Sequence, residues 1–401
     1  MSAEYMYELG NKKSVIRELF TYGQQRAAEV GADKVYDFSI GNPSIPAPPA
    51  VKEAILELME QPSLQVHGYT PAQGDGEVRQ ALADSINRKH AVACTPDLLY
   101  MTCGAAASLC CCIRAVTNPG DEWIVLAPFF PEYRCFVEAQ GGKLVVSEPD
   151  RESFQIDFAD LESRLNERTR AVIMNSPNNP SGVVYSAEVI ERLAELLCEK
   201  SAQYGHPIYL LADEPYAEIV YEGVQVPYVP EYYENTFVCY SYSKSLSLPG
   251  ERIGYIYVHE RMEEAQKIYT AINGAGRSLG YVCAPSLFQK VVGRCVDVLP
   301  DVAGYQKNRD ILYNALTEYG YTCVKPQGAF YLFVKTPWED SEVFCEYAKT
   351  HYDLLLVPSD SFGVKGYMRI SYCVSYEMIK RSLPAFRELI TECRKYGDTK
   401  Q

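Results

Sequence analysis

The sequence predicts an α/β protein in which helices cover a mostly parallel sheet. Apolar, strand-like runs alternate with helical stretches from about residue 50 to residue 277, which is the order that a parallel sheet with crossover helices requires. The expected strands are Trp123–Leu126, Lys143–Val146, Ala171–Met174, Tyr209–Ala212, Thr236–Cys239 and Arg252–Val258. Because open sheets of this kind bind ligands at the carboxyl ends of their strands, we expect functional side chains there.

The pattern changes after Gly280. Two long helical stretches, 286–298 and 302–319, are followed by short strands near 329–334 and 368–372. Helices and strands that are segregated along the chain in this way indicate an α+β arrangement rather than more of the parallel sheet. We therefore expect a second, smaller domain.

The composition fits a large globular protein. The chain has 401 residues, of which 47% are hydrophobic, which is enough for more than one domain and a substantial core. It has no long uncharged apolar run and no secretory pattern at its start, so we expect neither a membrane span nor a signal peptide. A net charge of −14 argues against nucleic acid or an anionic membrane as a partner.

The fourteen cysteines are scattered along the chain. Three of them, Cys110, Cys111 and Cys112, lie on an expected helix, and no Cys-x-x-Cys spacing suggests zinc or a redox dithiol. The five histidines show no metal-ligand spacing either. We expect reduced, packed cysteines in a cytoplasmic protein without a metal site.

The most informative segment runs from Ser241 to Gly254, with Lys244 among small hydroxyl residues and Arg252 eight places later. Lysine condenses with an aldehyde to give an exchangeable imine. Serine hydroxyls and a guanidinium are natural ligands of phosphate oxygens. The segment is therefore typical of a pyridoxal 5′-phosphate site, although a solvated lysine in a Ser-rich loop would give the same local pattern.

An apolar run beginning at Ile208 ends in Asp213, which it delivers to the carboxyl edge of the expected sheet. A carboxylate there pairs with a pyridine nitrogen and keeps it protonated, which makes the ring an electron sink. Tyr216, three residues on, is placed to donate its phenol to the 3′ oxygen of that ring. A strand-end aspartate alone is more often a helix cap or a turn residue.

Two further turns follow expected strands. Residues 170–174 run into a proline-stiffened turn, where the amide of Asn179 is a second donor for the ring's 3′ oxygen. Residues 98–103 pass through Gly104 into a run of small residues that opens a helix, and helix N-termini bind phosphate. Taken alone, the first is a common proline turn before a helix near Ser186, and the second is ordinary packing.

Together these residues resemble the class I/II aminotransferases of fold type I, close to the aspartate and aromatic aminotransferases. The resemblance covers nearly the whole chain, and its motifs occur in the family's order. They are Gly41-Asn42-Pro43, Tyr69, Gly104-Ala105-Ala106, Phe130, Asn179-Pro180-Ser181-Gly182, Asp213-x-x-Tyr216, Ser241-x-x-Lys244, Arg252 and Arg369. The resemblance implies a large domain over residues 48–285 with a seven-stranded, mostly parallel sheet between helices, and a smaller α+β domain formed by 1–47 and 286–401.

The same resemblance implies a role for each residue that binds the cofactor. Lys244 forms the Schiff base, Asp213 pairs with the ring nitrogen, and the 3′ oxygen is held by two donors, Asn179 and Tyr216. Phe130 stacks on the ring, a choice over Phe129 that only the resemblance supports. The phosphate ligands are Ser241, Arg252, the turn at Gly104 with the amides of Ala105 and Ala106, and Tyr69 from the second subunit of a homodimer.

For the substrate, the resemblance implies that Arg369 binds the α-carboxylate, with Gly41 and Asn179 beside it. Some aspartate-type relatives place a lysine where this chain has Ala106, which puts an acidic substrate in doubt. Arg17 and Arg277 are candidates for binding a distal carboxylate instead, although each also fits a surface charge.

The implied reaction moves an amino group between an L-amino acid and a 2-oxo acid, with the Lys244 amine as general base. Related folds also catalyse eliminations, so a carbon–sulfur lyase is the alternative. A cofactor-sensing transcription regulator is a remote third reading. It would need an attached basic DNA-binding domain, and about forty residues before the first motif are too few for one.

Overall fold

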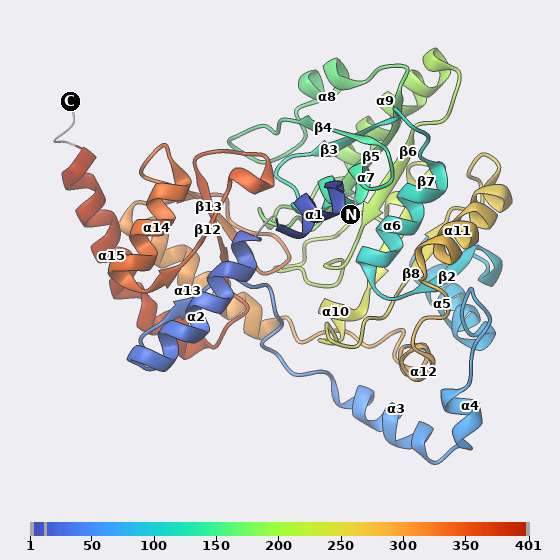
Figure 1. Cartoon of the computed structure of the whole chain (residues 1–401), viewed down its shortest axis with the longest axis horizontal. Coiled ribbons are helices and arrows are strands. Elements are labelled where there is room, and N and C mark those ends of the chain that lie inside the picture. The colour runs from blue at the N-terminus through green and yellow to red at the C-terminus, as the bar shows by residue number, and fades with distance from the viewer. Residues whose placement is uncertain (1–3, 12–13, 398–401) are drawn as a thin grey trace. The chain divides into compact units, whose positions relative to one another are not determined.

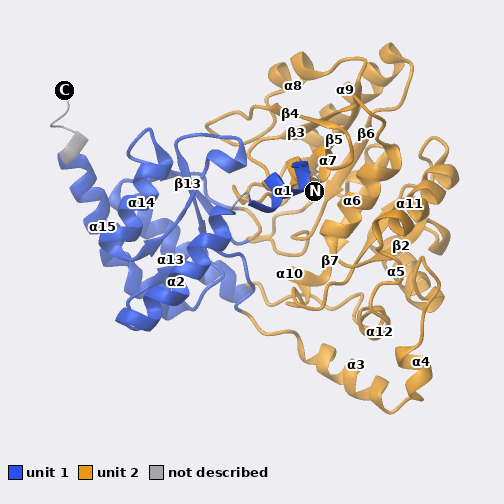
Figure 2. Cartoon of the chain, viewed as in Figure 1, with its two compact units in different colours: residues 1–44, 303–326, 330–401 blue, residues 45–302, 327–329 orange. Residues whose placement is uncertain are grey.

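The computed structural model describes residues 4–11 and 14–397. The chain divides into two compact units, coloured separately in Figure 2. The larger unit contains residues 45–302 and 327–329, and the smaller contains residues 1–44, 303–326 and 330–401. No helix within the described ranges is long and apolar enough to cross a membrane.

The larger unit is built on one seven-stranded sheet, whose strands run side by side in Figure 1. Six strands point the same way and β8 runs antiparallel to both of its neighbours, so the sheet is mostly parallel, as predicted. In sheet order the strands are β2 (Leu99–Thr102), β8 (Gly254–Val258), β7 (Thr236–Ser241), β6 (Tyr209–Asp213), β5 (Thr169–Asn175), β3 (Glu122–Leu126) and β4 (Lys143–Ser147).

The central strands are apolar along their whole length because both faces of the sheet are covered. All five residues of β6 and all six of β7 are buried. Helices α6 and α7 pack against strands of this sheet. The helices of the larger unit are α3 (Pro49–Met59), α4 (Ser63–His67), α5 (Gly76–Lys89), α6 (Ala105–Val116), α7 (Glu132–Glu138), α8 (Phe158–Arg164), α9 (Ala187–Tyr204), α10 (Tyr242–Ser245), α11 (Ala265–Leu279), α12 (Ser286–Arg294) and the 3-10 turns η1 (Pro96–Leu98) and η2 (Val229–Glu231).

The strand register brings five chain segments to one edge of this sheet. Asn175 at the end of β5 pairs with Asp213 at the end of β6, and Ser241 ends the adjacent strand β7. Gly254, the first residue of β8, pairs with Ser241 on one side and with Thr102 of β2 on the other. Every polar turn predicted to carry chemistry in the larger unit therefore begins or ends at this edge.

The smaller unit has an antiparallel four-stranded sheet and a two-stranded parallel sheet, which agrees with the predicted α+β character. Its strands are β12 (Val357–Pro358), β13 (Tyr367–Ser371), β10 (Tyr331–Lys335) and β9 (Thr322–Cys323) in sheet order, and the pair β1 (Tyr36–Asp37) and β11 (Leu354–Leu355). Its helices are α1 (Glu4–Asn11), α2 (Val15–Val30), α13 (Ala303–Tyr319), α14 (Ser341–Tyr352), α15 (Tyr376–Gly397) and the 3-10 turn η3 (Asp360–Phe362).

The compact units differ from the expected domain limits at α12. This helix packs on α3, α4 and α5 and belongs to the larger unit, whereas the expected boundary lay just before it. It also ends at Arg294 rather than at residue 298. The reason is tertiary: Asp297 accepts hydrogen bonds from Ser85 at 2.7 Å and Arg88 at 2.6 Å, which fixes the chain on α5 instead of continuing the helix.

Candidate active site

Lys244 lies on α10, a four-residue helix that directly follows β7. Ser241, the last residue of the strand, caps this helix by accepting a hydrogen bond from the Ser243 N–H at 3.2 Å. The Ser241 and Ser243 hydroxyls lie 2.7 Å apart, and both residues are buried, whereas Lys244 is partly exposed. The turn therefore holds a lysine beside two hydroxyls at the sheet edge.

Asp213 ends β6 on the neighbouring strand and is buried. Its Oδ2 accepts a hydrogen bond from the Tyr133 hydroxyl at 2.5 Å. Its Oδ1 is also buried and has no hydrogen-bond partner among the described residues. Burial raises the pKa of Asp213 to about 7, although the Tyr133 hydrogen bond acts in the opposite direction.

The unsatisfied Asp213 Oδ1 is a test of whether pyridoxal phosphate fits this site. A buried carboxylate oxygen without a partner is costly, and an N–H donor that carries positive charge removes that cost. The protonated ring nitrogen of the cofactor is such a donor. The residues present therefore fit the cofactor that the sequence predicts.

Asn179 is held in a turn that is tied to Asp213. Asn175, at the end of β5, donates its side-chain amide to the Asp213 backbone carbonyl at 2.8 Å. Its Oδ1 accepts from the Asn179 backbone N–H at 2.7 Å. Tyr216 is buried three residues after Asp213, so the two predicted donors for the ring's 3′ oxygen both follow strand ends at this edge.

Gly104 and Arg252 lie close together beside the start of α6, which begins at Ala105 and continues with Ala106. Gly104 has a φ of 88°, and a Cβ there would lie 3.0 Å from Nη2 of Arg252. The Arg252 guanidinium is exposed, and its Nη1 donates to the Pro249 carbonyl at 2.9 Å. A guanidinium beside a helix N-terminus with small side chains is suited to a phosphate group.

Phe130 and Phe129 differ in burial, which the sequence alone did not reveal. Phe129 is a core residue, whereas Phe130 is partly exposed. The ring of Phe130 packs edge-on against Tyr133, with centroids 5.6 Å apart. Since Tyr133 in turn binds Asp213, Phe130 is the phenylalanine that lies near the candidate ring-nitrogen partner.

No role for Tyr133 or Asn175 was predicted from the sequence. Asn175 carried a usable signal, because it is a polar residue at the carboxyl end of an apolar strand, as Asp213 is. Tyr133 carried none: it lies in the first turn of α7, far from Asp213 in sequence, and only the tertiary structure brings its hydroxyl there.

Three other candidate residues are exposed. Tyr69, in the loop after α4, is 99% exposed, and Arg277 is exposed near the end of α11. In the smaller unit, Arg17 is exposed near the start of α2. None of these three side chains is among the buried groups described above, so a role for any of them needs a second molecule or a substrate.

In the smaller unit, Arg369 lies in the middle of β13 and is buried. Its Nη2 donates to the Ser39 carbonyl at 2.6 Å. Its guanidinium lies 4.8 Å from the centre of the Tyr331 ring and 5.1 Å from that of Phe362. A Cβ at Gly41 would collide with the Tyr331 hydroxyl, so any larger residue there would have to displace the Tyr331 ring. The predicted substrate residues Arg369 and Gly41 thus share one neighbour, Tyr331.

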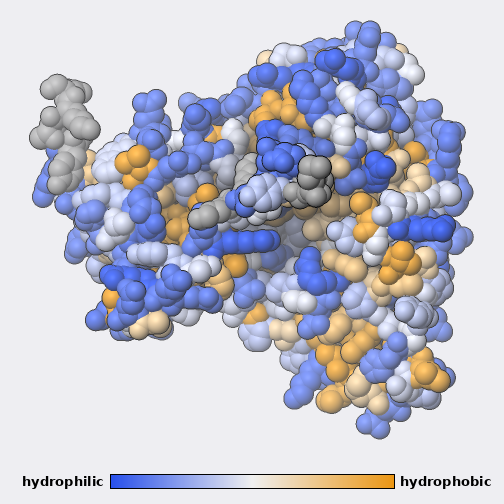
Figure 3. Space-filling model, viewed as in Figure 1, coloured by the Kyte–Doolittle hydropathy of each residue, from blue (hydrophilic) through white to orange (hydrophobic). Residues whose placement is uncertain are grey.

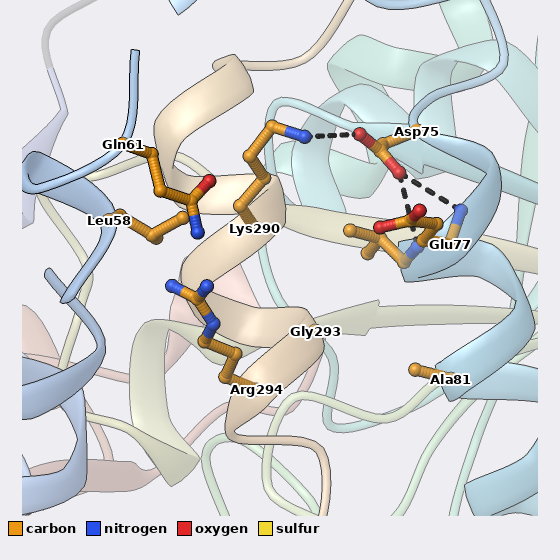
Figure 4. A pocket seen from close by; sticks show the side chains of 9 residues that line it. Leu58, Gln61, Asp75, Glu77, Ala81, Lys290, Gly293 and Arg294 are labelled. Carbon is orange, nitrogen blue, oxygen red and sulfur yellow. Dashed lines mark hydrogen bonds and ion pairs between the residues drawn. The ribbon is translucent and has the colours of Figure 1, made fainter. Parts of the chain in front are cut away.

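A separate pocket of about 200 Å³ lies between α3, α5 and α12 (Figure 4). Lys290 of α12 reaches toward Asp75, the N-cap residue of α5, and their ion pair is 2.6 Å long. None of the candidate residues lines this pocket. The Lys290–Asp75 ion pair has a structural role, because it holds the carboxylate that caps the start of α5.

The fold and the site at its sheet edge define the class of protein, an enzyme of pyridoxal-phosphate chemistry. The family described as aminotransferase class I and II matches residues 33–386, and the chain belongs to that family.

Three relatives illustrate the similarity. An aspartate/prephenate aminotransferase of Thermus thermophilus is 30% identical over 87% of this chain and 89% of its own length. An aromatic-amino-acid aminotransferase of Thermococcus litoralis is 27% identical, over 94% of this chain and 96% of its own. A crystal structure of an aminotransferase from Eubacterium rectale is 56% identical with a TM-score of 0.96, and it covers 98% of this chain and 99% of that one.

The chain is therefore an aminotransferase that uses pyridoxal 5′-phosphate to move an amino group between an L-amino acid and a 2-oxo acid. All three relatives are named as aminotransferases, so the carbon–sulfur lyase alternative gains no support from them.

Proposed function

We propose that Lys244 holds the cofactor covalently and that Asp213 is the partner of its ring nitrogen. The observation that supports this most directly is the buried Oδ1 of Asp213, which has no hydrogen-bond partner among the described residues. Asp213 pairs with Cys239 of β7, two residues before Ser241, where β7 ends and α10 follows. Asn179 and Tyr216 then hold the 3′ oxygen, and Phe130 stacks on the ring. The phosphate is bound by Ser241, Arg252 and the start of α6 at Gly104, Ala105 and Ala106.

When bound, the cofactor ring takes up the electrons that remain when a proton leaves the substrate's α-carbon. The chain's own residues make that loss easy. The Asp213 carboxylate holds a proton on the ring nitrogen, and Tyr133 orients the carboxylate through its hydrogen bond. Lys244 Nζ would act as the general base that takes the proton from the substrate's α-carbon.

The test is to locate the covalent linkage. Borohydride reduction of the purified enzyme, followed by peptide mass spectrometry, should place the cofactor on Lys244, and Lys244→Ala should abolish the reducible linkage. Lys290→Ala is the matched control, because Lys290 is paired with Asp75 and should leave the linkage intact. A reduced linkage that persists in Lys244→Ala would overturn the assignment.

We further propose that the enzyme is a homodimer in the cytoplasm. Leu56 and Met59 on α3 and Leu64 on α4 are exposed apolar side chains, with Leu64 at 88%, and Figure 3 shows apolar surface in this region. Monomeric proteins rarely expose a cluster of apolar side chains to solvent, so we expect a partner to cover this one. The partner that the family resemblance implies is a second copy of the chain. None of the fourteen cysteines, all of which lie in the described residues, forms a disulfide, which suits a reducing compartment.

Subunit complementation tests the homodimer. If Tyr69 reaches the phosphate of the neighbouring subunit, a hybrid of Tyr69→Ala and Lys244→Ala subunits has one intact site. Random mixing should then restore about a quarter of wild-type activity, since half of the dimers are hybrids with one working site each. A chain that sediments as a monomer, or mixing that restores nothing after proven subunit exchange, would contradict the proposal.

We propose that Arg369 binds the α-carboxylate of every substrate, whereas Arg17 or Arg277 acts only on a distal carboxylate. Relatives named for aspartate and for aromatic amino acids both occur, so the distinction is open to measurement. Arg369→Lys keeps the charge but loses the planar fork, and kcat/KM should fall for all amino acids. If Arg17 or Arg277 pairs with a buried distal carboxylate, replacing that arginine should cost about 2–5 kcal/mol of binding free energy for aspartate. Substrates without a distal carboxylate should be unaffected.

The measurement is the ratio of kcat/KM for aspartate to that for phenylalanine in Arg17→Ala and Arg277→Ala, with Arg369→Lys as the comparison. If neither alanine variant shifts the ratio, the enzyme does not use these arginines for acidic substrates, and an aromatic or neutral substrate is favoured.

A further inference from the structure

A chain of three polar groups, of which Tyr240 and Ser245 are buried and Glu218 is partly buried, ends at α10. The Tyr240 hydroxyl is 2.8 Å from Oε1 of Glu218 and 2.8 Å from Oγ of Ser245. A phenol has one proton, so Tyr240 donates to one of these groups and accepts from the other. When Glu218 is ionised it only accepts, and Ser245 then supplies its proton to Tyr240.

The packing around Tyr240 leaves this hydroxyl little freedom. Tyr240 is buried on β7, stacks on Tyr255 with ring centroids 5.0 Å apart, and meets Tyr242 edge-on at 5.1 Å. Ser245 is buried as well. The three-residue chain therefore connects the strand before the lysine, the loop after β6 and the end of α10 as one fixed unit.

The helix α10 depends on such ties because it is only one turn long. A single helical turn is not stable by itself, so its position is set by the groups at its ends. Ser241 caps the first end, and Ser245, the last residue, is held by Tyr240. Lys244 lies directly before Ser245.

We propose that Glu218, Tyr240 and Ser245 are positioning residues that hold α10 so that Lys244 meets the cofactor. This inference rests on the proposed role of Lys244. Their proposed role is exerted through the helix that carries the lysine, by the hydrogen bonds that join Tyr240 to Glu218 and to Ser245.

The first test is Tyr240→Phe, which keeps the ring and removes the hydroxyl. The dissociation constant of pyridoxal phosphate should rise about tenfold, as expected for the loss of about one hydrogen bond's net contribution. Tyr242→Phe is the matched control: it is a tyrosine on α10 in the same aromatic group, and its hydroxyl has no hydrogen bond to any described residue. It should bind the cofactor as the wild type does.

The second test uses Glu218, so that the proposal does not depend on one variant folding. Glu218→Gln keeps an oxygen acceptor for Tyr240 and should retain cofactor affinity, whereas Glu218→Leu has no acceptor and should weaken it as Tyr240→Phe does. A purely structural role would lower the thermal stability of both proteins without this division in affinity.

Wild-type affinity in Tyr240→Phe, or equal losses in Tyr242→Phe or in Glu218→Gln, would overturn the proposal. Borohydride mapping of Tyr240→Phe keeps this result separate from the proposed function. If the reduced cofactor is still found on Lys244 while affinity is unchanged, the positioning role fails and the assignment of Lys244 stands.

Discussion

Asp213 and Glu214 are buried carboxyl groups that are adjacent in the chain. Their neighbours stabilise the ionised form of the two groups to different degrees. Asp213 is the last residue of β6, and the N–H of Glu214, directly after it, donates to the Cys239 carbonyl of β7 at 3.0 Å. Each has one buried carboxylate oxygen without a hydrogen-bond partner in the described part of the chain.

The neighbours of the two groups differ. Tyr133 donates a hydrogen bond to Asp213, which favours the ionised form against the effect of burial. Glu214 receives no such help: burial, with smaller contributions from the nearby Glu218 and Asp213 carboxyls, raises its pKa to about 8. Burial alone therefore does not mark a functional acid. What distinguishes Asp213 is a donor on one oxygen and a free acceptor on the other, which prepares it for a cation.

Among changes around these two acids, Asp213→Asn should have the largest effect. An amide does not hold a proton on the ring nitrogen, so turnover should fall on the order of 10²–10³-fold, the range seen when one electrostatic contact is removed from an active site. The apoprotein should be at least as stable as the wild type at pH 8, because no charge is then buried. Single-turnover rates and urea unfolding measure the two effects, and near-normal turnover would remove the distinction between the two acids.

Tyr133→Phe should have an intermediate effect. Without the Tyr133 hydrogen bond the pKa of Asp213 rises further, so less of it is ionised at neutral pH and the cofactor binds about tenfold more weakly. The loss should shrink as the pH rises to 9, since Asp213 is then ionised in both proteins. Cofactor titrations at several pH values test this, and a loss that does not change with pH would indicate only a packing defect.

Glu214→Gln should have the smallest effect on catalysis, within about twofold, because a neutral amide replaces an acid that is mostly neutral. Its effect on stability depends on pH. The pKa of Glu214 is higher in the folded chain than when unfolded, so wild-type stability is full below about pH 4 and falls as the pH rises through about 8. Glu214→Gln has no group that titrates at this position, so its stability does not fall in this way. The difference in unfolding free energy between Glu214→Gln and the wild type should therefore grow in favour of the variant between pH 5 and pH 9. An advantage that stays constant would show that Glu214 does not titrate there.

The sequence predicted the features that depend on local pattern. Asp213 and Ser241 end apolar runs, so their place at the sheet edge follows from strand direction alone. Tyr133, Glu218 and Tyr240 were not predicted as a set, because their hydroxyl and carboxyl groups meet through packing between distant segments. The end of α12 was misplaced for the same reason, since a contact with α5 decides it.

The close approach of strands β7 and β8 has a consequence for altering this enzyme by directed evolution. A Cβ at Gly254 would lie 2.2 Å from the Tyr240 carbonyl and 3.1 Å from the Gly104 Cα, so even alanine forces two backbones apart. A Cβ at Gly250, in the loop just before β8, would have no atom within 4 Å. In a saturation library, position 254 should therefore lose every variant while position 250 keeps many, which leaves the loop before β8 as the segment through which the phosphate end of the site can be varied.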